Sequence, residues 1–209
     1  MTGGVYSSRE VAAKVKKEVG VVDVLVNNGN SIVCLVTSFL AGIVTGKTMF
    51  DSSDSMIKKV MEVNTMSHFW TIREFVPAML ERNSGSVVAI ASMAGMVGTA
   101  NLNDYCASKF AVVGLMESLA GQVYNEGKTG VHCSVICPYY IDTGMFAGVN
   151  PGILWILKPR DVVNKVGFTI LYYDFKSFNN HLKIILIGRW FRQLNMEMPL
   201  SRALFSLAD

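Results

Sequence analysis

The sequence predicts an α/β protein built around a parallel sheet. Short apolar runs, each long enough for one buried strand, alternate with longer segments whose apolar residues recur at helical spacing. This alternation is typical of a parallel sheet with helices packed against its faces. The chain has 209 residues, of which 51% are hydrophobic and 17% charged, so it is large enough for one domain with a substantial core.

The first half of the chain contains three expected elements. We expect a helix over residues 8–18, since a Ser-Ser-Arg-Glu stretch can cap its start, and then a short apolar strand over residues 21–26. Residues 52–82 are predicted to be helical, with a break around Asn64 and with Pro77 late in the segment.

The second half repeats the pattern. Residues 86–91 are small and apolar, which indicates a buried strand, and a helix is expected over residues 104–122. Its core-facing positions, at helical spacing, are Val112, Leu115, Met116 and Leu119. Another apolar strand is expected over residues 131–137, ended by Pro138. Further on, either Ile170–Tyr173 or Lys183–Ile187 fits a strand.

Ser92, Tyr105 and Lys109 form the strongest candidate site. Tyr105 and Lys109 are four residues apart, so on a helix they share a face. An ammonium beside a phenol favours the phenolate, so we expect Lys109 to lower the pKa of Tyr105 from its usual value of about 10. Ser92, at the end of a predicted strand, can hydrogen-bond the same substrate oxygen. The three residues suit proton exchange with an alcohol or carbonyl, although a Tyr-x-x-x-Lys spacing alone equally fits a buried tyrosine near a solvated lysine.

Other function classes have little support. A net charge of +3 without a basic stripe argues against nucleic acid as a partner. The four cysteines, Cys34, Cys106, Cys133 and Cys137, form no Cys-x-x-Cys pair. His132 and Cys133 would point to opposite faces of a strand, so no metal site is expected. No segment reaches the roughly 18 uninterrupted apolar residues of a membrane span.

Five motifs in the same order resemble those of the short-chain dehydrogenase/reductase family. They are Asn27-Asn28, Asn64 in Met-Glu-Val-Asn-Thr, Ser92, Tyr105-Cys-Ala-Ser-Lys109, and Cys137-Pro-Tyr-Tyr-Ile-Asp-Thr-Gly-Met-Phe146. Three segments most resemble the branch of retinol dehydrogenases and 17β-hydroxysteroid dehydrogenases, namely Asp104-Tyr-Cys-Ala-Ser-Lys109, Phe69-Trp-Thr71 and Asp142-Thr-Gly-Met-Phe146. The resemblance covers about residues 5–167 and implies a Rossmann-like, doubly wound parallel sheet that lacks its first βαβ unit. Residues 168–209 then form a divergent apolar tail.

The resemblance also implies roles for individual residues. Tyr105 would exchange a proton with the substrate oxygen, Lys109 would hold the nicotinamide ribose, and Ser92 would stabilise the developing alkoxide. Asn64 would support a water relay behind Lys109. The cofactor, NAD or NADP, would carry the hydride. The residues implied to bind it are Asn27, Asn28, Ala41, Gly42, Tyr105, Lys109, Pro138 and Thr143.

A lipophilic alcohol or carbonyl compound, of retinoid or steroid type, is the substrate that the resemblance implies. Members of the family commonly dimerise through two long helices, here about residues 67–82 and 104–122. The retinol and steroid branch is typically held on endoplasmic reticulum or lipid-droplet membranes. A cytoplasmic location is expected if the N-terminal segment of that branch is the only anchor.

Two departures from the family pattern leave a second interpretation open. The family's Thr-Gly-x-x-x-Gly-x-Gly turn, which receives the pyrophosphate at a helix N-terminus, is not found before Asn27. Residues 29–40 interrupt an Asn-Asn-Ala-Gly signature, as a retained intron, a gene-model error or a tolerated surface loop would. The alternative to an enzyme is therefore a catalytically inactive, N-terminally truncated isoform or fragment. It would bind NADH very weakly and could at most dimerise or associate with lipid surfaces.

Overall fold

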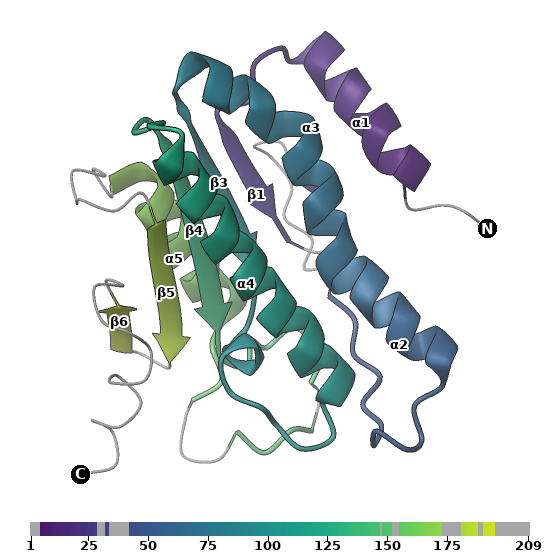
Figure 1. Ribbon diagram of the computed structural model, residues 1–209. Helices are drawn as coiled ribbons and strands as arrows, with labels where there is room; N and C mark the ends of the chain where they lie inside the picture. The colour runs from purple at the N-terminus through teal and green to yellow at the C-terminus, as the bar shows by residue number, and fades with distance from the viewer. Residues whose placement is uncertain are drawn as a thin grey trace.

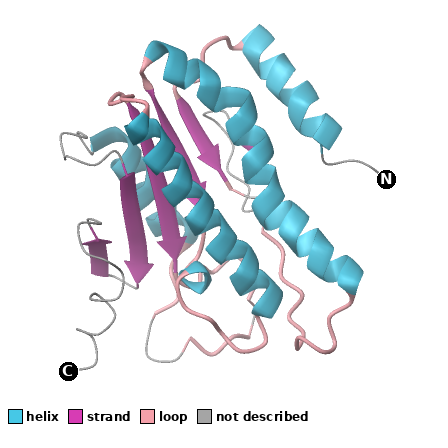
Figure 2. Cartoon of the chain, viewed as in Figure 1, coloured by secondary structure: helices cyan, strands magenta, loops and turns pink. Residues whose placement is uncertain are grey.

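The computed structural model describes residues 5–28, 32–33, 42–146, 148–151, 155–172, 181–187 and 190–194. Within these residues the chain forms a six-stranded sheet in the order β2-β1-β3-β4-β5-β6, with helices on both faces (Figure 1). Strands and helices alternate along most of the chain (Figure 2). The predicted α/β class is confirmed.

The central strands of the sheet are parallel. They are β1 (Val24–Asn27), β3 (Gly85–Ile90), β4 (Val131–Pro138) and β5 (His181–Ile187). A short antiparallel strand lies at each edge, β2 (Ile32–Val33) beside β1 and β6 (Trp190–Leu194) beside β5. Because the central strands share one direction, their carboxyl ends meet at one edge of the sheet, where ligands bind in folds of this type.

The helices α1 (Val5–Glu18), α2 (Asp54–Met61), α3 (Ser67–Arg82) and α4 (Asn103–Asn125) follow the expected segments closely. A further helix, α5 (Pro159–Tyr172), follows β4. The predicted break near Asn64 is a π-helical turn, η1 (Glu62–Met66), between α2 and α3. The first strand begins later than expected. The pairing of β1 with β3 starts at Val24, and Val21 lies before it with its side chain 65% exposed.

Two apolar layers hold the helices on the sheet. On one face, Val87 and Ala89 of β3 pack with α1, α3 and α4, whose fully buried residues include Met79 and Met116. On the other face, Val88 and Ile90 pack with α5. Successive strand residues face opposite layers, which is why these strands are apolar throughout instead of alternating with polar residues. Val112 and Met116 are buried in the first layer, and Leu115 and Leu119 pack against it, as the helical spacing predicts.

The predicted tail contributes to the same sheet. Of its two candidate strands, Lys183–Ile187 lies in β5, whereas residues 170–172 belong to α5. Of the predicted insertion at residues 29–40, the structure describes only Ile32–Val33; Cys34 and Ala41 lie outside the described residues. The division into a 1–167 domain and a 168–209 tail therefore stays a prediction. In the described parts of the chain, no helix has the length and apolarity needed to cross a membrane.

Candidate active site

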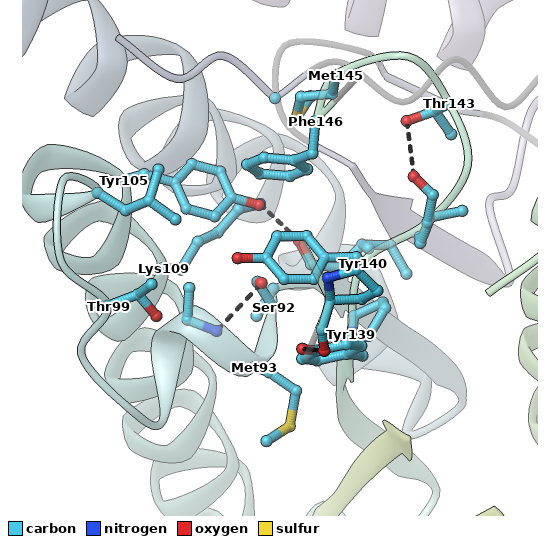
Figure 3. A pocket seen from close by; sticks show the side chains of 18 of the residues that line it. Ser92, Met93, Thr99, Tyr105, Lys109, Tyr139, Tyr140, Thr143, Met145 and Phe146 are labelled. Atoms are coloured by element: carbon cyan, nitrogen blue, oxygen red, sulfur yellow. Dashed lines mark hydrogen bonds between the residues drawn. The ribbon is translucent and has the colours of Figure 1, made fainter. Parts of the chain in front are cut away.

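A cavity of about 480 Å³ lies where β3 and β4 end and α4 begins (Figure 3). It brings together most of the side chains that the sequence singles out. The predicted site residues that line it are Asn28, Gly42, Ser92, Tyr105, Lys109, Pro138 and Thr143. These residues are spread over more than 100 positions of the chain and meet because the parallel strands end side by side.

Ser92 is held by the short turn that follows β3. It precedes a 3-10 turn, η2 (Met93–Gly95), and its Oγ accepts a hydrogen bond of 3.1 Å from the Ala94 N–H. The turn lies directly on α4. A Cβ atom added at Gly95 would be only 2.6 Å from the carbonyl oxygen of Lys109. The glycine therefore permits the close contact that places Ser92 across the cavity from Tyr105.

Tyr105 and Lys109 lie one turn apart on α4, and both are buried. Lys109 Nζ is 5.7 Å from the centroid of the Tyr105 ring and donates a hydrogen bond of 3.2 Å to the Ile90 carbonyl at the end of β3. The ammonium group is thus anchored to the sheet beside the phenol. The phenol oxygen and Ser92 Oγ point into the same part of the cavity (Figure 3).

Burial dominates the electrostatics of the site. It raises the pKa of Tyr105 to about 12, while a hydrogen bond with the Ser92 side chain acts in the opposite direction and Cys106 and Tyr140 raise it further. Burial also lowers the pKa of Lys109 to about 8. Loss of hydration therefore outweighs the hydrogen bond with Ser92 and places the pKa of Tyr105 above its usual value, while the lowering expected from Lys109 stays a prediction.

Asn64 connects the segment that precedes α2 to α4. Its Oδ1 accepts from the Ile43 N–H at 2.9 Å, and its Nδ2 donates to the Ile43 carbonyl at 2.9 Å and to Ser108 Oγ at 3.1 Å. The neighbouring Thr65 donates to the Ser108 carbonyl at 3.0 Å. Asn64 is fully buried and does not line the cavity. Its side chain holds α4 in place, and the water relay stays a prediction.

Ser108 is a positioning residue that the sequence interpretation missed. Its hydroxyl donates to the Tyr105 carbonyl at 2.7 Å while accepting from Asn64. It therefore links the π-helical turn to the segment of α4 that carries both Tyr105 and Lys109. Its place directly before Lys109 in the Tyr-Cys-Ala-Ser-Lys run is the signal that could have identified it.

An aromatic group lies beside Tyr105. Phe146 meets the Tyr105 ring edge to face, with centroids 5.8 Å apart, and meets Tyr140 in the same way at 5.0 Å. Tyr139 and Tyr140 are 4.8 Å apart. All three of Tyr139, Tyr140 and Phe146 line the cavity.

Comparison with known proteins shows the family of this chain. The family model described as short chain dehydrogenase matches residues 6–153, which is more than half of the chain. The chain belongs to this family.

Several short-chain dehydrogenases share much of this sequence. The chain is 42% identical over 171 residues to Epidermal retinol dehydrogenase 2 of Homo sapiens, covering 80% of this chain and 50% of that protein. It is 47% identical over 140 residues to Short-chain dehydrogenase/reductase family 16C member 6 of Bos taurus, covering 67% and 40%. The chain thus spans half or less of the length of these relatives.

A solved structure supports the fold. The protein 4-hydroxyisoleucine dehydrogenase complexed with NADH matches with a TM-score of 0.69 and 23% identity, covering 87% of this chain and 74% of that one. A parallel, Rossmann-like sheet is therefore shared with a dehydrogenase of different sequence.

The residues expected to face the cofactor of a short-chain dehydrogenase divide into two groups. Six of the eight line the cavity: Asn28, Gly42, Tyr105, Lys109, Pro138 and Thr143. Asn27 instead points into the core, where its Oδ1 accepts a hydrogen bond of 2.6 Å from Thr71 Oγ1 on α3. Ala41, the remaining member of the set, lies outside the described residues.

His68, on α3, is another buried titratable residue near the short-chain dehydrogenase site. It is fully buried, and burial, with a contribution from the charge of Lys109, lowers its pKa to about 3. Neither ring nitrogen has a hydrogen-bond partner among the described residues. Among all the residues that the structure describes, there is no group of three or more His, Cys, Asp and Glu side chains that could hold a metal.

Proposed function

We propose that this chain carries the proton-handling part of an NAD(P)-dependent oxidoreductase that acts on a retinoid-like alcohol or aldehyde. The observation that supports the proposal best is the cavity itself, in which Ser92 and Tyr105 hydroxyls face one space with Lys109 anchored behind them. The sequence similarity to retinol dehydrogenases favours a retinoid over a steroid.

The cavity lining fits the nicotinamide end of such a cofactor. Gly42 and Pro138 present little bulk, Asn28 and Thr143 offer polar atoms, and Lys109 supplies a buried donor for a ribose hydroxyl. When bound, the nicotinamide supplies or accepts the hydride at the substrate carbon. These residues would hold it beside the site where Tyr105 handles the proton.

Tyr105 would act as the acid in carbonyl reduction. With its pKa raised to about 12, the phenol is protonated at neutral pH, so it can give its proton to the substrate oxygen as the carbon gains hydride. The Ser92 hydroxyl would donate a hydrogen bond to the same oxygen and stabilise its developing charge. Lys109 would then stabilise the phenolate that remains. Alcohol oxidation uses the same steps in reverse.

Turnover of retinal with NADH or NADPH tests this proposal. Tyr105→Phe should reduce turnover by roughly a hundredfold or more, because it removes the proton donor and keeps the ring packing against Phe146. Tyr124→Phe is a matched control, since Tyr124 is 65% exposed near the end of α4. Undiminished turnover in Tyr105→Phe would remove Tyr105 from its proposed role.

Cofactor binding distinguishes the inactive-isoform alternative from the proposed oxidoreductase. We expect the alternative, if correct, to show no turnover by the unaltered chain and only very weak NADH binding in a fluorescence titration. Micromolar NADH affinity would exclude it. A steroid ketone offered in place of retinal tests the substrate class in the same assay.

Two further properties of the family belong to this proposal. A homodimer through α3 and α4 is supported by the exposed side chains of Phe69 and Phe110 on these helices, which are 38% and 46% accessible. Sedimentation equilibrium of the unaltered chain and of a Phe69→Glu/Phe110→Glu variant tests it. Association with endoplasmic reticulum or lipid-droplet membranes is tested by flotation of the chain with liposomes.

A further inference from the structure

Tyr139 and Tyr140 are adjacent in the loop after β4, yet their hydroxyl groups have different environments. The Tyr139 hydroxyl donates a hydrogen bond of 2.7 Å to the Pro151 carbonyl, and its side chain packs against the apolar layer beneath α5. The Tyr140 hydroxyl has no hydrogen-bond partner in the described ranges of the chain. Tyr139 therefore supports the loop, whereas Tyr140 presents an available hydroxyl to the cavity.

The Tyr140 hydroxyl points toward the reactive groups. In Figure 3 it is directed to the same part of the cavity as Ser92 Oγ and the Tyr105 hydroxyl. Its proximity also has an electrostatic effect, because Tyr140 contributes to the raised pKa of Tyr105. An oxygen atom of a ligand placed between Ser92 and Tyr105 would lie near this third hydroxyl.

The Tyr140 ring forms part of an aromatic wall. We use this name for Tyr105, Phe146 and Tyr140, which meet edge to face with interplanar angles of 79° and 72°. Such contacts favour flat, conjugated ligands over saturated chains, because a π system interacts with ring edges and faces beyond simple area burial. Cavities of this kind bind ligands mainly by apolar contact and orient them with a few polar groups.

We propose that Tyr140 is a substrate-binding residue. As part of the aromatic wall, its ring contacts the flat conjugated part of the substrate, and its hydroxyl donates a hydrogen bond to the substrate oxygen. The assignment rests on the proposed function for the nature of that oxygen. The contact between the wall and a conjugated ligand can be measured without any turnover.

Binding of all-trans-retinol, followed by its fluorescence, tests the assignment in the full 209-residue chain. Tyr140→Phe should weaken binding roughly three- to tenfold, which corresponds to one lost hydrogen bond. Tyr140→Leu should weaken it tenfold or more, because the aromatic contact is lost as well. Hexadecanol, a saturated alcohol, should lose only the hydrogen bond, so its competition should weaken about three- to tenfold in both Tyr140→Phe and Tyr140→Leu. Tyr124→Phe is the control and should bind retinol normally.

The possible outcomes separate this inference from the proposed function. Unchanged retinol affinity in Tyr140→Leu would overturn the role of Tyr140 and leave the oxidoreductase proposal standing. Retinol binding that depends on Tyr140, without turnover by the unaltered chain, would support Tyr140 and contradict the oxidoreductase proposal. A complete lack of retinol binding by the unaltered chain would overturn both.

A second measurement does not depend on retinol. Because Tyr140 raises the pKa of Tyr105, Tyr140→Phe should lower the pKa of Tyr105, which tyrosinate absorbance reports when compared with the Tyr105→Phe chain. Tyr140→Phe keeps the ring and its contact with Phe146, so this variant is expected to fold normally. An unshifted Tyr105 titration would contradict the close placement of the two hydroxyls.

Discussion

The buried polar groups around α4 differ from those between β1 and α3. Beside α4, the side chains of Asn64, Thr65, Ser108 and Lys109 all make hydrogen bonds, and of the Asp104 carboxylate only Oδ2 has no partner among the described residues. Between β1 and α3, Asn27 Nδ2 and both ring nitrogens of His68 have no partner among the described residues. Asn64 and His68 are equally inaccessible to solvent, so the difference lies in partners and not in burial.

This difference indicates which buried polar residues hold the site together. A buried group with partners keeps its neighbours in place, whereas one without partners costs about 1–3 kcal/mol of stability. The α4 side is therefore the rigid part of the site, which suits residues that must keep a phenol and an ammonium group at fixed positions relative to each other. Removing an uncharged, hydrogen-bonded side chain beside α4 should therefore lower stability more than removing an unpartnered one between β1 and α3.

Asn64→Ala should have the largest effect. It removes three hydrogen bonds and leaves the Ile43 backbone groups unpaired, so the free energy of unfolding should fall by about 3 kcal/mol. Urea denaturation measures this value. Asn125→Ala, at an exposed position near the end of α4, is the control and should change stability by less than about 0.5 kcal/mol. A loss below about 1 kcal/mol for Asn64→Ala would show that η1 does not hold α4.

Gly95→Ala should destabilise the same side by roughly 1–3 kcal/mol, because the added Cβ would lie 2.6 Å from a backbone oxygen of α4. Gly98→Ala is a matched control three residues away, where a Cβ meets nothing within 4 Å. Thermal unfolding compares the two variants. Equal melting temperatures would contradict the close contact between η2 and α4.

Lys109→Met should stabilise the chain by roughly 1–2 kcal/mol at neutral pH while abolishing any turnover. The folded-state pKa of Lys109 is about 8 and its usual value is 10.5, so the folded protein disfavours the charged form. The penalty is complete below pH 8, decreases between pH 8 and 10.5, and vanishes above that range. In denaturation experiments at several pH values, the increase in the free energy of unfolding caused by Lys109→Met should be largest below pH 8 and should disappear above pH 10.5. A destabilised Lys109→Met chain at pH 7 would instead indicate that the hydrogen bond to Ile90 outweighs the burial of charge.

His68→Leu should have the smallest effect at neutral pH, a change within about 1 kcal/mol, because no hydrogen bond of the ring to described residues is lost. Its effect should appear in acid. With the pKa of His68 lowered from 6.5 to about 3, the unfolded chain binds a proton that the folded chain does not. As the pH decreases from 6.5 to about 3, the free energy of unfolding should therefore fall by up to about 1.4 kcal/mol per pH unit. The same acid dependence in His68→Leu would exclude His68 as its source.

Much of the fold was predictable because it follows from local pattern. The apolar run of β3, the helical spacing of α4 and the break near Asn64 all appear where expected. The start of β1 was misplaced because Val21 is apolar yet exposed, and residue type alone does not report exposure. The choice between two tail strands likewise depended on pairing with β4, a contact distant in sequence.

The sequence alone determined that Tyr105 and Lys109 share one helical face and that Ser92 follows a buried strand, because both are consequences of local spacing. The tertiary structure decided the rest. The pKa of Tyr105 rises because Ala94, Cys106 and Phe146 pack around its ring and exclude water, and Asn64 holds α4 because η1 packs against it. The available hydroxyl of Tyr140 is likewise a result of folding, since its neighbour Tyr139 reaches Pro151 and Tyr140 does not. Hydration and hydrogen-bond partners depend on which distant segments meet, and spacing along the chain does not specify them.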